Sequence, residues 1–239
     1  MKYDITENKM IARDIWKMVL QGDVSAIQRP GQFVQLHVPG FYLPRPISVC
    51  DWGQGEMTLV YRAAGEGTRA MTGLGGQVEA LPGLGNGYDL DALGHRPLLV
   101  GGGVGVPPLL GLCRALAERG AHVTAALGFR SREDAILMEA FMALGAQVRV
   151  ATEDGSLGEK GFVTALLGGD FTAFACCGPE IMMKNVAAAL EIPGQMSFEA
   201  RMACGFGACM GCSRPMKSGM KRVCADGPVF DKEDVIWQI

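Results

Sequence analysis

The chain has 239 residues, a formal net charge of −3 and 49% apolar residues. This composition is typical of a globular protein, and the slight acidity argues against nucleic acid or an anionic membrane as a partner. No apolar run reaches the roughly 18 residues of a membrane span, and the N-terminus lacks the apolar core of a signal peptide. We therefore expect a cytoplasmic protein whose eight cysteines serve packing or metal binding and not disulfides.

Residues 1–95 contain short β-rich stretches that are broken by glycine and proline. Strands are expected at residues 33–38, 57–62 and 77–80. Short strands at this spacing, without a convincing long helix, indicate a small antiparallel barrel or sandwich.

Two short motifs in this region could bind a ligand. In Arg45-Pro46-Ile47-Ser48, an arginine beside a rigid proline and a nearby hydroxyl could hold a phosphate and the edge of a flavin. In Gly65-Glu66-Gly67-Thr68, the glycines would let a ligand approach the backbone closely, and Thr68 offers one hydroxyl. Taken alone, the first motif is better interpreted as a surface turn before a strand, and the second equally as a hairpin loop.

After Arg96, continuous apolar strands alternate with helical patterns as far as Pro193-Gly194. The expected strands are 98–100, 122–129, 147–151 and 171–177, and the expected helices are 109–119, 134–144, 163–167 and 179–190. This alternation indicates a doubly wound parallel sheet. The sequence thus predicts a β-barrel domain at 1–95, an α/β domain at 96–194 and a small module at 195–239.

Three loops of the α/β domain are candidates for binding a nucleotide. The stretch 101–108 follows a strand and opens a helix, where glycines and backbone N–H groups can accept a pyrophosphate. Asp154-Gly155-Ser156 and Cys177-Gly178-Pro179 end two later strands at the same edge of the sheet. A tight turn without a ligand is the alternative for the first two loops. The Cys177 thiol could face a nicotinamide ring or be an ordinary core residue.

Four cysteines near the C-terminus carry the most specific pattern of the chain. They are Cys204, Cys209, Cys212 and Cys224, with the spacing C-x4-C-x2-C and eleven further residues before the fourth cysteine. This is the ligand spacing of plant-type [2Fe–2S] proteins. A structural zinc site is the alternative, but zinc favours paired C-x2-C knuckles and only one such pair is present. The pattern predicts an iron–sulfur cluster and transfer of single electrons.

Together these motifs resemble the ferredoxin-reductase-like flavoenzymes, and more narrowly the electron-transfer subunits of NAD-linked (class 1B) dihydroorotate dehydrogenase. The narrower likeness rests on residues 30–33, 152–156, 198–209 and 223–230. It implies an FAD-binding antiparallel β-barrel, a doubly wound NAD-binding α/β domain and a C-terminal [2Fe–2S] module.

The resemblance also assigns cofactor contacts by matching position. For FAD these are Arg45, Pro46, Ile47, Ser48, Val60, Tyr61, Arg62, Gly67 and Thr68. For NAD they are Gly103, Val104, Gly105, Val106, Gly128, Phe129, Arg130, Ser131, Asp154, Gly155, Ser156, Cys177, Gly178 and Pro179. Cys204, Cys209, Cys212 and Cys224 would hold the cluster. Arg130 and Arg132 could instead hold the 2′-phosphate of NADP, although Glu133 and Asp134 would offset their charge.

The implied function is electron transfer within a larger enzyme. Electrons would pass from FMN in a separate dihydroorotate-oxidising subunit through the cluster and FAD to NAD+, as two copies of each subunit in a heterotetramer. FAD is needed because nicotinamides exchange electrons in pairs and clusters singly. No residue of this chain is expected to act on dihydroorotate. The alternatives are the equivalent subunit of an NADH-dependent ferredoxin:NADP+ oxidoreductase, a sulfide dehydrogenase or a hydrogenase-linked diaphorase, or a non-catalytic redox sensor or scaffold.

Overall fold

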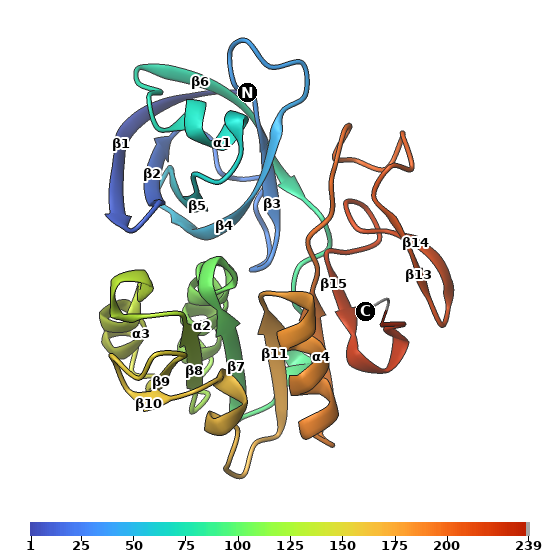
Figure 1. Ribbon diagram of the computed structural model, residues 1–239. Coiled ribbons are helices and arrows are strands. Elements are labelled where there is room, and N and C mark those ends of the chain that lie inside the picture. Colours follow the sequence, from blue (N-terminus) through green and yellow to red (C-terminus); the bar gives the residue numbers. More distant parts are fainter. Residues whose placement is uncertain (238–239) are drawn as a thin grey trace.

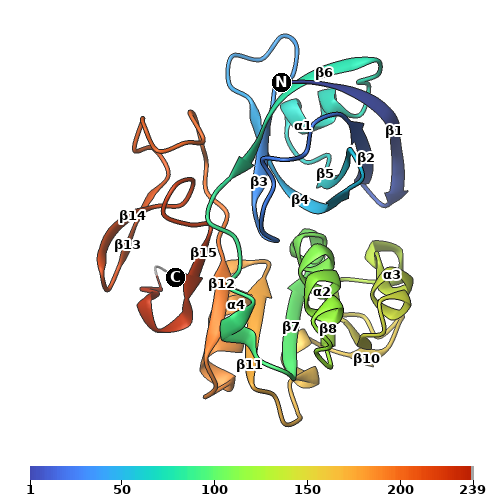
Figure 2. The same ribbon diagram turned by 180° about the vertical axis from the view of Figure 1, so that it is seen from behind.

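The computed structural model describes residues 1–237, which form a β-barrel, an α/β sheet and a cysteine-containing module at residues 198–237 (Figure 1). The barrel lies above the sheet in this view, and the cysteine-containing module runs along one side of both. Figure 2 shows from behind that the segment joining barrel and sheet runs beside the module. Among the described residues, no helix combines the length and apolar character needed to cross a membrane.

Six antiparallel strands close the barrel in the order β1-β2-β5-β4-β3-β6. They are β1 (Lys2–Ala12), β2 (Ile15–Gln21), β3 (Phe33–Leu36), β4 (Arg45–Gly53), β5 (Glu56–Arg62) and β6 (Gln77–Leu84). Along β5, Leu59 and Tyr61 point into the barrel core while Val60 points out toward the α/β sheet. This alternation confirms the expected barrel, and the short helix α1 (Glu66–Met71) packs Met71 into its core.

The second sheet has seven strands in the order β10-β9-β8-β7-β11-β12-β15. They are β7 (Pro97–Gly102), β8 (Thr124–Phe129), β9 (Gln147–Thr152), β10 (Glu159–Lys160), β11 (Ala173–Cys177), β12 (Gly194–Ser197) and β15 (Val229–Asp231). All neighbouring pairs are parallel except β12 and β15. The parallel sheet is therefore as expected, with one antiparallel edge strand contributed by the cysteine-containing module.

Helices cover both faces of this sheet, which makes it doubly wound. Alternate residues of β7 divide between the two faces: Leu99 packs with α2 (Pro108–Glu118) and α3 (Met138–Ala143), while Leu98 packs with α4 (Glu180–Ala189). The 3₁₀ helix Val163–Leu166 lies on the same face as α4. Since both faces are covered, the central strands β7 and β11 are buried and lack charged or strongly polar residues, as the sequence pattern indicates.

One predicted helix, 134–144, is wrong in its first half. A 3₁₀ turn spans Arg132–Asp134, and the Ser131 hydroxyl before it donates to the Asp134 carboxylate at 3.0 Å. Ile136 is then buried, Leu137 takes a left-handed conformation with φ 63°, and α3 begins only at Met138. The burial of Ile136 below the loop overrides the local helical pattern.

The barrel and the sheet meet where α2 crosses β4. Arg114 on α2 forms an ion pair with Asp51 at 2.6 Å and donates to the Trp52 carbonyl at 2.8 Å. Gly111 lies opposite β4, where a Cβ would come within 3.0 Å of the Cys50 carbonyl. This close approach fixes the barrel against α2.

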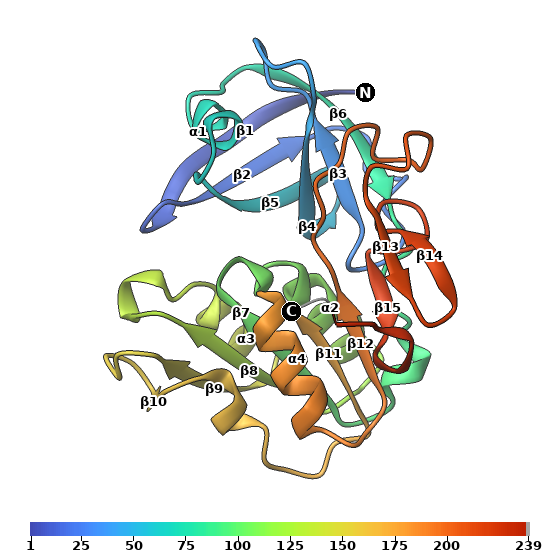
Figure 3. The same cartoon turned by 45° about the vertical axis from the view of Figure 1, so that its right-hand side comes forward.

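The cysteine-containing module, residues 198–237, joins the sheet directly (Figure 3). It holds the hairpin of β13 (Ser213–Met216) and β14 (Gly219–Arg222), and then β15 pairs with β12. Cys212 and Cys224 belong to the same hydrophobic cluster as Leu98 on the sheet. The module and the sheet therefore share one core. The strand β12 also continues to Ser197, past the predicted domain limit at 194.

Candidate functional site

A cleft of about 520 Å³ opens at the carboxyl edge of the parallel sheet, facing the barrel. Its walls come from the ends of β7, β8 and β11, from the start of α4 and from Arg62 on the barrel. Predicted nucleotide contacts that line it are Gly103, Val104, Gly105, Gly128, Phe129, Arg130, Gly178 and Pro179. The carboxyl edge is where ligands bind in sheets of this kind.

The loop between β7 and α2 has the backbone freedom and closeness that an anion site needs. Gly103 has φ 54°, in the left-handed region that favours glycine. Gly105 lies so close to the backbone of Cys177 and Gly178 that a Cβ would overlap both. Val106 is fully buried below the loop and acts as its support. The residues present therefore fit a nucleotide phosphate over this loop.

The predicted contacts after β8 and β9 divide between the cleft and its flank. The Ser131 hydroxyl is engaged with Asp134 and does not line the cleft. The stretch Asp154–Ser156 also lies outside it: the Asp154 carboxylate accepts from the Ser156 N–H and hydroxyl at 2.9 and 2.6 Å, which lowers the Asp154 pKa. Glu153 lines the cleft in its place.

Cys177 is a buried residue at the end of β11. Its side chain is 4% exposed, and burial raises the pKa of the thiol to about 12. The thiol packs in the core cluster that includes Leu99 and Leu109, while Gly178 and Pro179 line the cleft. Of the two interpretations of Cys177, the structure favours the core thiol.

The sequence patterns missed several residues of the cleft. They are Asp134, Glu153, Gly161, Phe162, Val163, Thr164, Ile181, Met182, Asn185 and Glu199. Glu199 follows β12 and is exposed, but the surrounding protein desolvates its carboxyl group and so raises its pKa. Glu153 and Glu199 lie within stretches that carry the family resemblance but were not assigned to a cofactor. The others come from loops and helix starts that no motif marks.

The predicted flavin contacts gather at one side of the barrel. Arg45–Ser48 begin β4, Val60–Arg62 end the adjacent β5, and Gly67 and Thr68 lie in α1. The Arg45 guanidinium lies over the Phe41 ring at 4.7 Å and directly against Gly67, where any Cβ would overlap it. A guanidinium beside the first turn of a helix gathers positive charge and N–H groups, which fits a diphosphate.

Three of these residues already have side-chain hydrogen bonds within the protein: Arg45 Nη1 donates to the Leu43 carbonyl at 2.6 Å, and the hydroxyl groups of Tyr61 and Thr68 are also engaged. The Tyr61 hydroxyl donates to Asn8 Oδ1 at 3.0 Å inside the barrel, and burial raises its pKa to about 12. The Thr68 hydroxyl accepts from the N–H groups of Ala64 and Gly65 at 3.1 and 3.0 Å. Tyr61 can therefore contact a flavin only through its main chain, and the Thr68 side chain caps its own helix.

Substituting Arg45 by Gln should weaken FAD binding by about 10- to 100-fold, because a charge-assisted hydrogen bond contributes about 1.5–3 kcal/mol. The affinity can be measured by flavin fluorescence quenching on reconstitution of the flavin-free protein. Arg69→Gln removes the same charge from the exposed end of α1 and is the control. Equal affinities of the two variants would contradict a phosphate-binding role for Arg45.

The four cysteines lie in two pairs, of which Cys212 and Cys224 are buried in the module and Cys209 is exposed. The Cys209 N–H donates to Cys204 Sγ at 3.4 Å, and the Cys224 N–H donates to Cys212 Sγ at 3.4 Å. The N–H groups of Phe206 and Ala208 also point to the Cys204 sulfur, and together they lower its thiol pKa to about 6. Among residues 1–237, no three Cys, His, Asp or Glu side chains converge on one ion.

This donor set fits a binuclear iron–sulfur cluster. Each iron of a [2Fe–2S] cluster takes two thiolates, which corresponds to two pairs of cysteines. Backbone N–H groups directed at sulfur stabilise the thiolate and the bound cluster. Gly205 and Gly207 make this loop possible, with φ of 77° and 93°. The pairing matches the predicted cluster better than the alternative single zinc ion, which needs all four ligands around one point.

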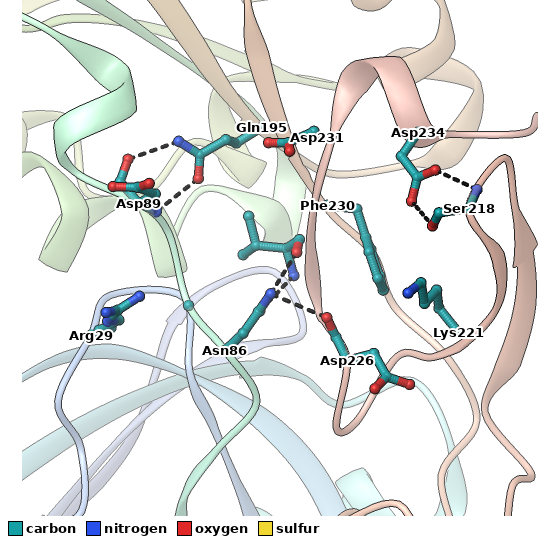
Figure 4. Close-up of a pocket in the computed structure, with 12 residues that line it drawn as sticks. Arg29, Asn86, Asp89, Gln195, Ser218, Lys221, Asp226, Phe230, Asp231 and Asp234 are labelled. Carbon is teal, nitrogen blue, oxygen red and sulfur yellow. Dashed lines mark hydrogen bonds between the residues drawn. The ribbon is translucent and has the colours of Figure 1, made fainter.

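A second cavity of about 350 Å³ lies between the barrel–sheet connection and the module (Figure 4). None of the predicted site residues lines it. Its polar groups hold these parts together: Asn86 Nδ2 donates to the Val229 carbonyl at 2.8 Å, and the Gln195 amide bonds the backbone of Asp89 in both directions. We interpret this cavity as part of the joint between the module and the sheet.

Comparisons with known proteins match these three parts. Residues 199–236 match the family described as the iron–sulfur cluster binding domain of dihydroorotate dehydrogenase B. The chain is 40% identical over 97% of its length to the electron transfer subunit of dihydroorotate dehydrogenase B (NAD(+)) from Shouchella clausii, and 38% identical to that of Fusobacterium nucleatum. In both cases 96% of the relative is covered.

Solved structures share the whole arrangement. An NADH-dependent reduced ferredoxin-NADP oxidoreductase structure superposes with a TM-score of 0.90 at 29% identity, covering 98% of this chain and 90% of that one. Phthalate dioxygenase reductase covers 90% of this chain and 86% of its own at a TM-score of 0.68 and 19% identity. The second likeness shows the fold alone.

Proposed function

This chain belongs to the family of electron-transfer subunits of NAD-linked dihydroorotate dehydrogenase B, and we propose that it carries electrons from a dihydroorotate-oxidising catalytic subunit to NAD+. The observation that carries the proposal is the four-cysteine loop beside the barrel of a ferredoxin-reductase-like fold. FAD, when bound, exchanges electrons singly with a cluster and in pairs with a nicotinamide.

The residues of this chain bind and orient the three redox groups. In the proposal, Arg45 and the start of α1 hold the FAD diphosphate, and the loop at Gly103–Val106 holds the nicotinamide dinucleotide. The paired cysteines hold the cluster in the module. The Arg114–Asp51 ion pair fixes the barrel against α2 and so keeps the flavin and nucleotide sites in register. The chemistry on dihydroorotate is assigned to the partner.

The histidines of the chain are consistent with assigning the chemistry on dihydroorotate to the partner subunit. His37 lies exposed on the barrel, and His95 and His122 are exposed at the start of the sheet. His122 contacts His95 only through a backbone hydrogen bond of 2.8 Å. None of the three lines either cavity. Proton abstraction from dihydroorotate needs a positioned base, and these residues do not provide one.

The partner assay tests the proposal directly. We expect the chain, purified from its own cells by affinity, to retain an FMN-containing subunit and to reduce NAD+ with dihydroorotate. The chain alone should oxidise NADH with artificial dyes and be inactive toward dihydroorotate. A co-purified partner with several iron–sulfur clusters and no orotate formation would contradict the proposal.

That contrary result would favour the equivalent subunit of an NADH-dependent ferredoxin:NADP+ oxidoreductase. The TM-score of 0.90 to such a structure keeps this second function in view. The partner, and not this chain, distinguishes the two, because both need the same flavin and cluster sites here. We also propose a cytoplasmic heterotetramer with two copies of each subunit; the eight free cysteines suit a reducing compartment.

A further inference from the structure

Gln35 on β3 is a deeply buried side chain whose amide has no partner in the described part of the chain. It is 4% exposed, and neither Nε2 nor Oε1 accepts or donates a hydrogen bond there. A buried amide without a partner loses its hydration and gains nothing in return. A partner that completes this site is therefore expected.

The amide faces the cysteine loop and not the barrel interior. Val34 and Leu36, its neighbours on β3, pack in the barrel core, so the alternation of the strand directs Gln35 outward. There it meets Gly205, where a Cβ would overlap Nε2, Cγ and Cδ of Gln35. Gly205 directly follows Cys204, a predicted cluster ligand. The amide thus lies at the first residue of the loop that wraps the Cys204 sulfur.

We propose that Gln35 Nε2 donates a hydrogen bond to a sulfur on the Cys204 side of the [2Fe–2S] cluster and raises the reduction potential of the cluster. The proposal rests on the proposed cluster site. The other N–H groups around Cys204 belong to the loop itself, whereas Gln35 is supplied by the barrel. Donors to sulfur favour the reduced cluster because it carries one more negative charge.

The position of Gln35 also connects the cluster with the flavin strand. Gln35 pairs with Pro46 on β4, within the predicted FAD contacts, and with Leu81 on β6. A displacement of the barrel relative to the module would move the donor away from the cluster. Gln35 therefore makes the cluster potential depend on correct docking of the barrel.

The first test is the midpoint potential of the cluster in Gln35→Met, measured by EPR-monitored redox titration of the FAD- and cluster-loaded protein. Methionine fills a similar volume but cannot donate. We expect the ratio of reduced to oxidised cluster at a fixed potential to fall about tenfold, which corresponds to about 59 mV for one electron. An unchanged potential would overturn the proposal.

Gln32→Met is the matched control. Gln32 directly precedes the same strand, β3, but its amide is satisfied: Oε1 accepts from the N–H groups of Gln28 and Arg29, and Nε2 donates to the Gly83 and Gly85 carbonyls at 3.0 and 2.9 Å. This substitution should lower the melting temperature and leave the potential unchanged. Equal shifts of potential in both variants would indicate general loosening and refute the assignment to Gln35.

A measurement on the wild-type protein does not depend on the stability of a variant. Pulsed EPR of the reduced cluster, after labelling glutamine side-chain amides with ¹⁵N, should show a weak ¹⁵N coupling that Gln32→Met keeps and Gln35→Met loses. Absence of this coupling from the wild type would overturn the role of Gln35. Iron and sulfide analysis distinguishes failure of the Gln35 proposal from failure of the proposed cluster site. A wild-type chain that binds no cluster contradicts the cluster site itself.

Discussion

Substituting Cys209 by Ser should reduce dihydroorotate-dependent NAD+ reduction by more than about 100-fold. Changes in groups that only support metal ligands already cost about 10–100-fold, and Cys209 is a predicted ligand. NADH oxidation by an artificial dye should remain within about twofold of wild type, because that route uses the cleft and the barrel but not the cysteine loop. Both rates are measured on the purified complex, with iron content determined in parallel.

Cys113→Ala is the control for this experiment. Cys113 is fully buried in α2, and its thiol pKa is raised to about 12 by burial, so it serves as a packing residue. We expect it to lower stability slightly and to leave the cluster in place. If Cys209→Ser lost both activities together, the cysteine loop would be needed for folding. If it kept full activity with the partner, Cys209 would not be a ligand.

Substituting Gly105 by Ala should raise KM for NADH by about tenfold or more and destabilise the fold by about 1–3 kcal/mol, the usual range for overpacking. The added Cβ would overlap backbone atoms of Cys177 and Gly178, which cannot rotate away as a flexible side chain would. The two loops that line the cleft must then separate. Steady-state kinetics with a dye acceptor and thermal unfolding measure both effects.

Gly168→Ala provides the comparison. Gly168 lies in the same domain, and a Cβ there has no atom within 4 Å. We expect wild-type KM and stability for this variant. An unchanged KM in Gly105→Ala, together with a normal content of FAD and iron, would remove the β7–α2 loop from the nucleotide site.

The sequence correctly predicted strands and helices whose structure is determined by the pattern of their own residues. The apolar runs of β7 and β8 and the helix after Pro179 are in the expected places, since covered parallel strands and helix starts leave a clear pattern. The β1–β2 hairpin was not predicted, because β1 is half-exposed and interrupted by register shifts that obscure the period of two.

The site was predictable to the extent that motifs mark it. The glycine loop and Gly178 do line the cleft, whereas Asp154–Ser156 lie at its flank and Tyr61 points into the barrel. Glu199 and Gln35 were missed because their surroundings come from distant parts of the chain. A lone polar residue in an apolar strand, such as Gln35 in Phe33–Leu36, was the available signal. The predicted contacts themselves await the substitutions above.

The pairing of β15 with β12 makes the iron–sulfur carrier a fixed relay and not a swinging shuttle. Its last strand is an edge strand of the nucleotide domain, and Cys212 and Cys224 share a core with Leu98. A mobile iron–sulfur domain can move between its electron donor and its electron acceptor. This module is fixed, so the donor must dock against it. For protein engineering, the same pairing means that the module is not a portable unit: transplanting residues 198–237 would require β12 as well.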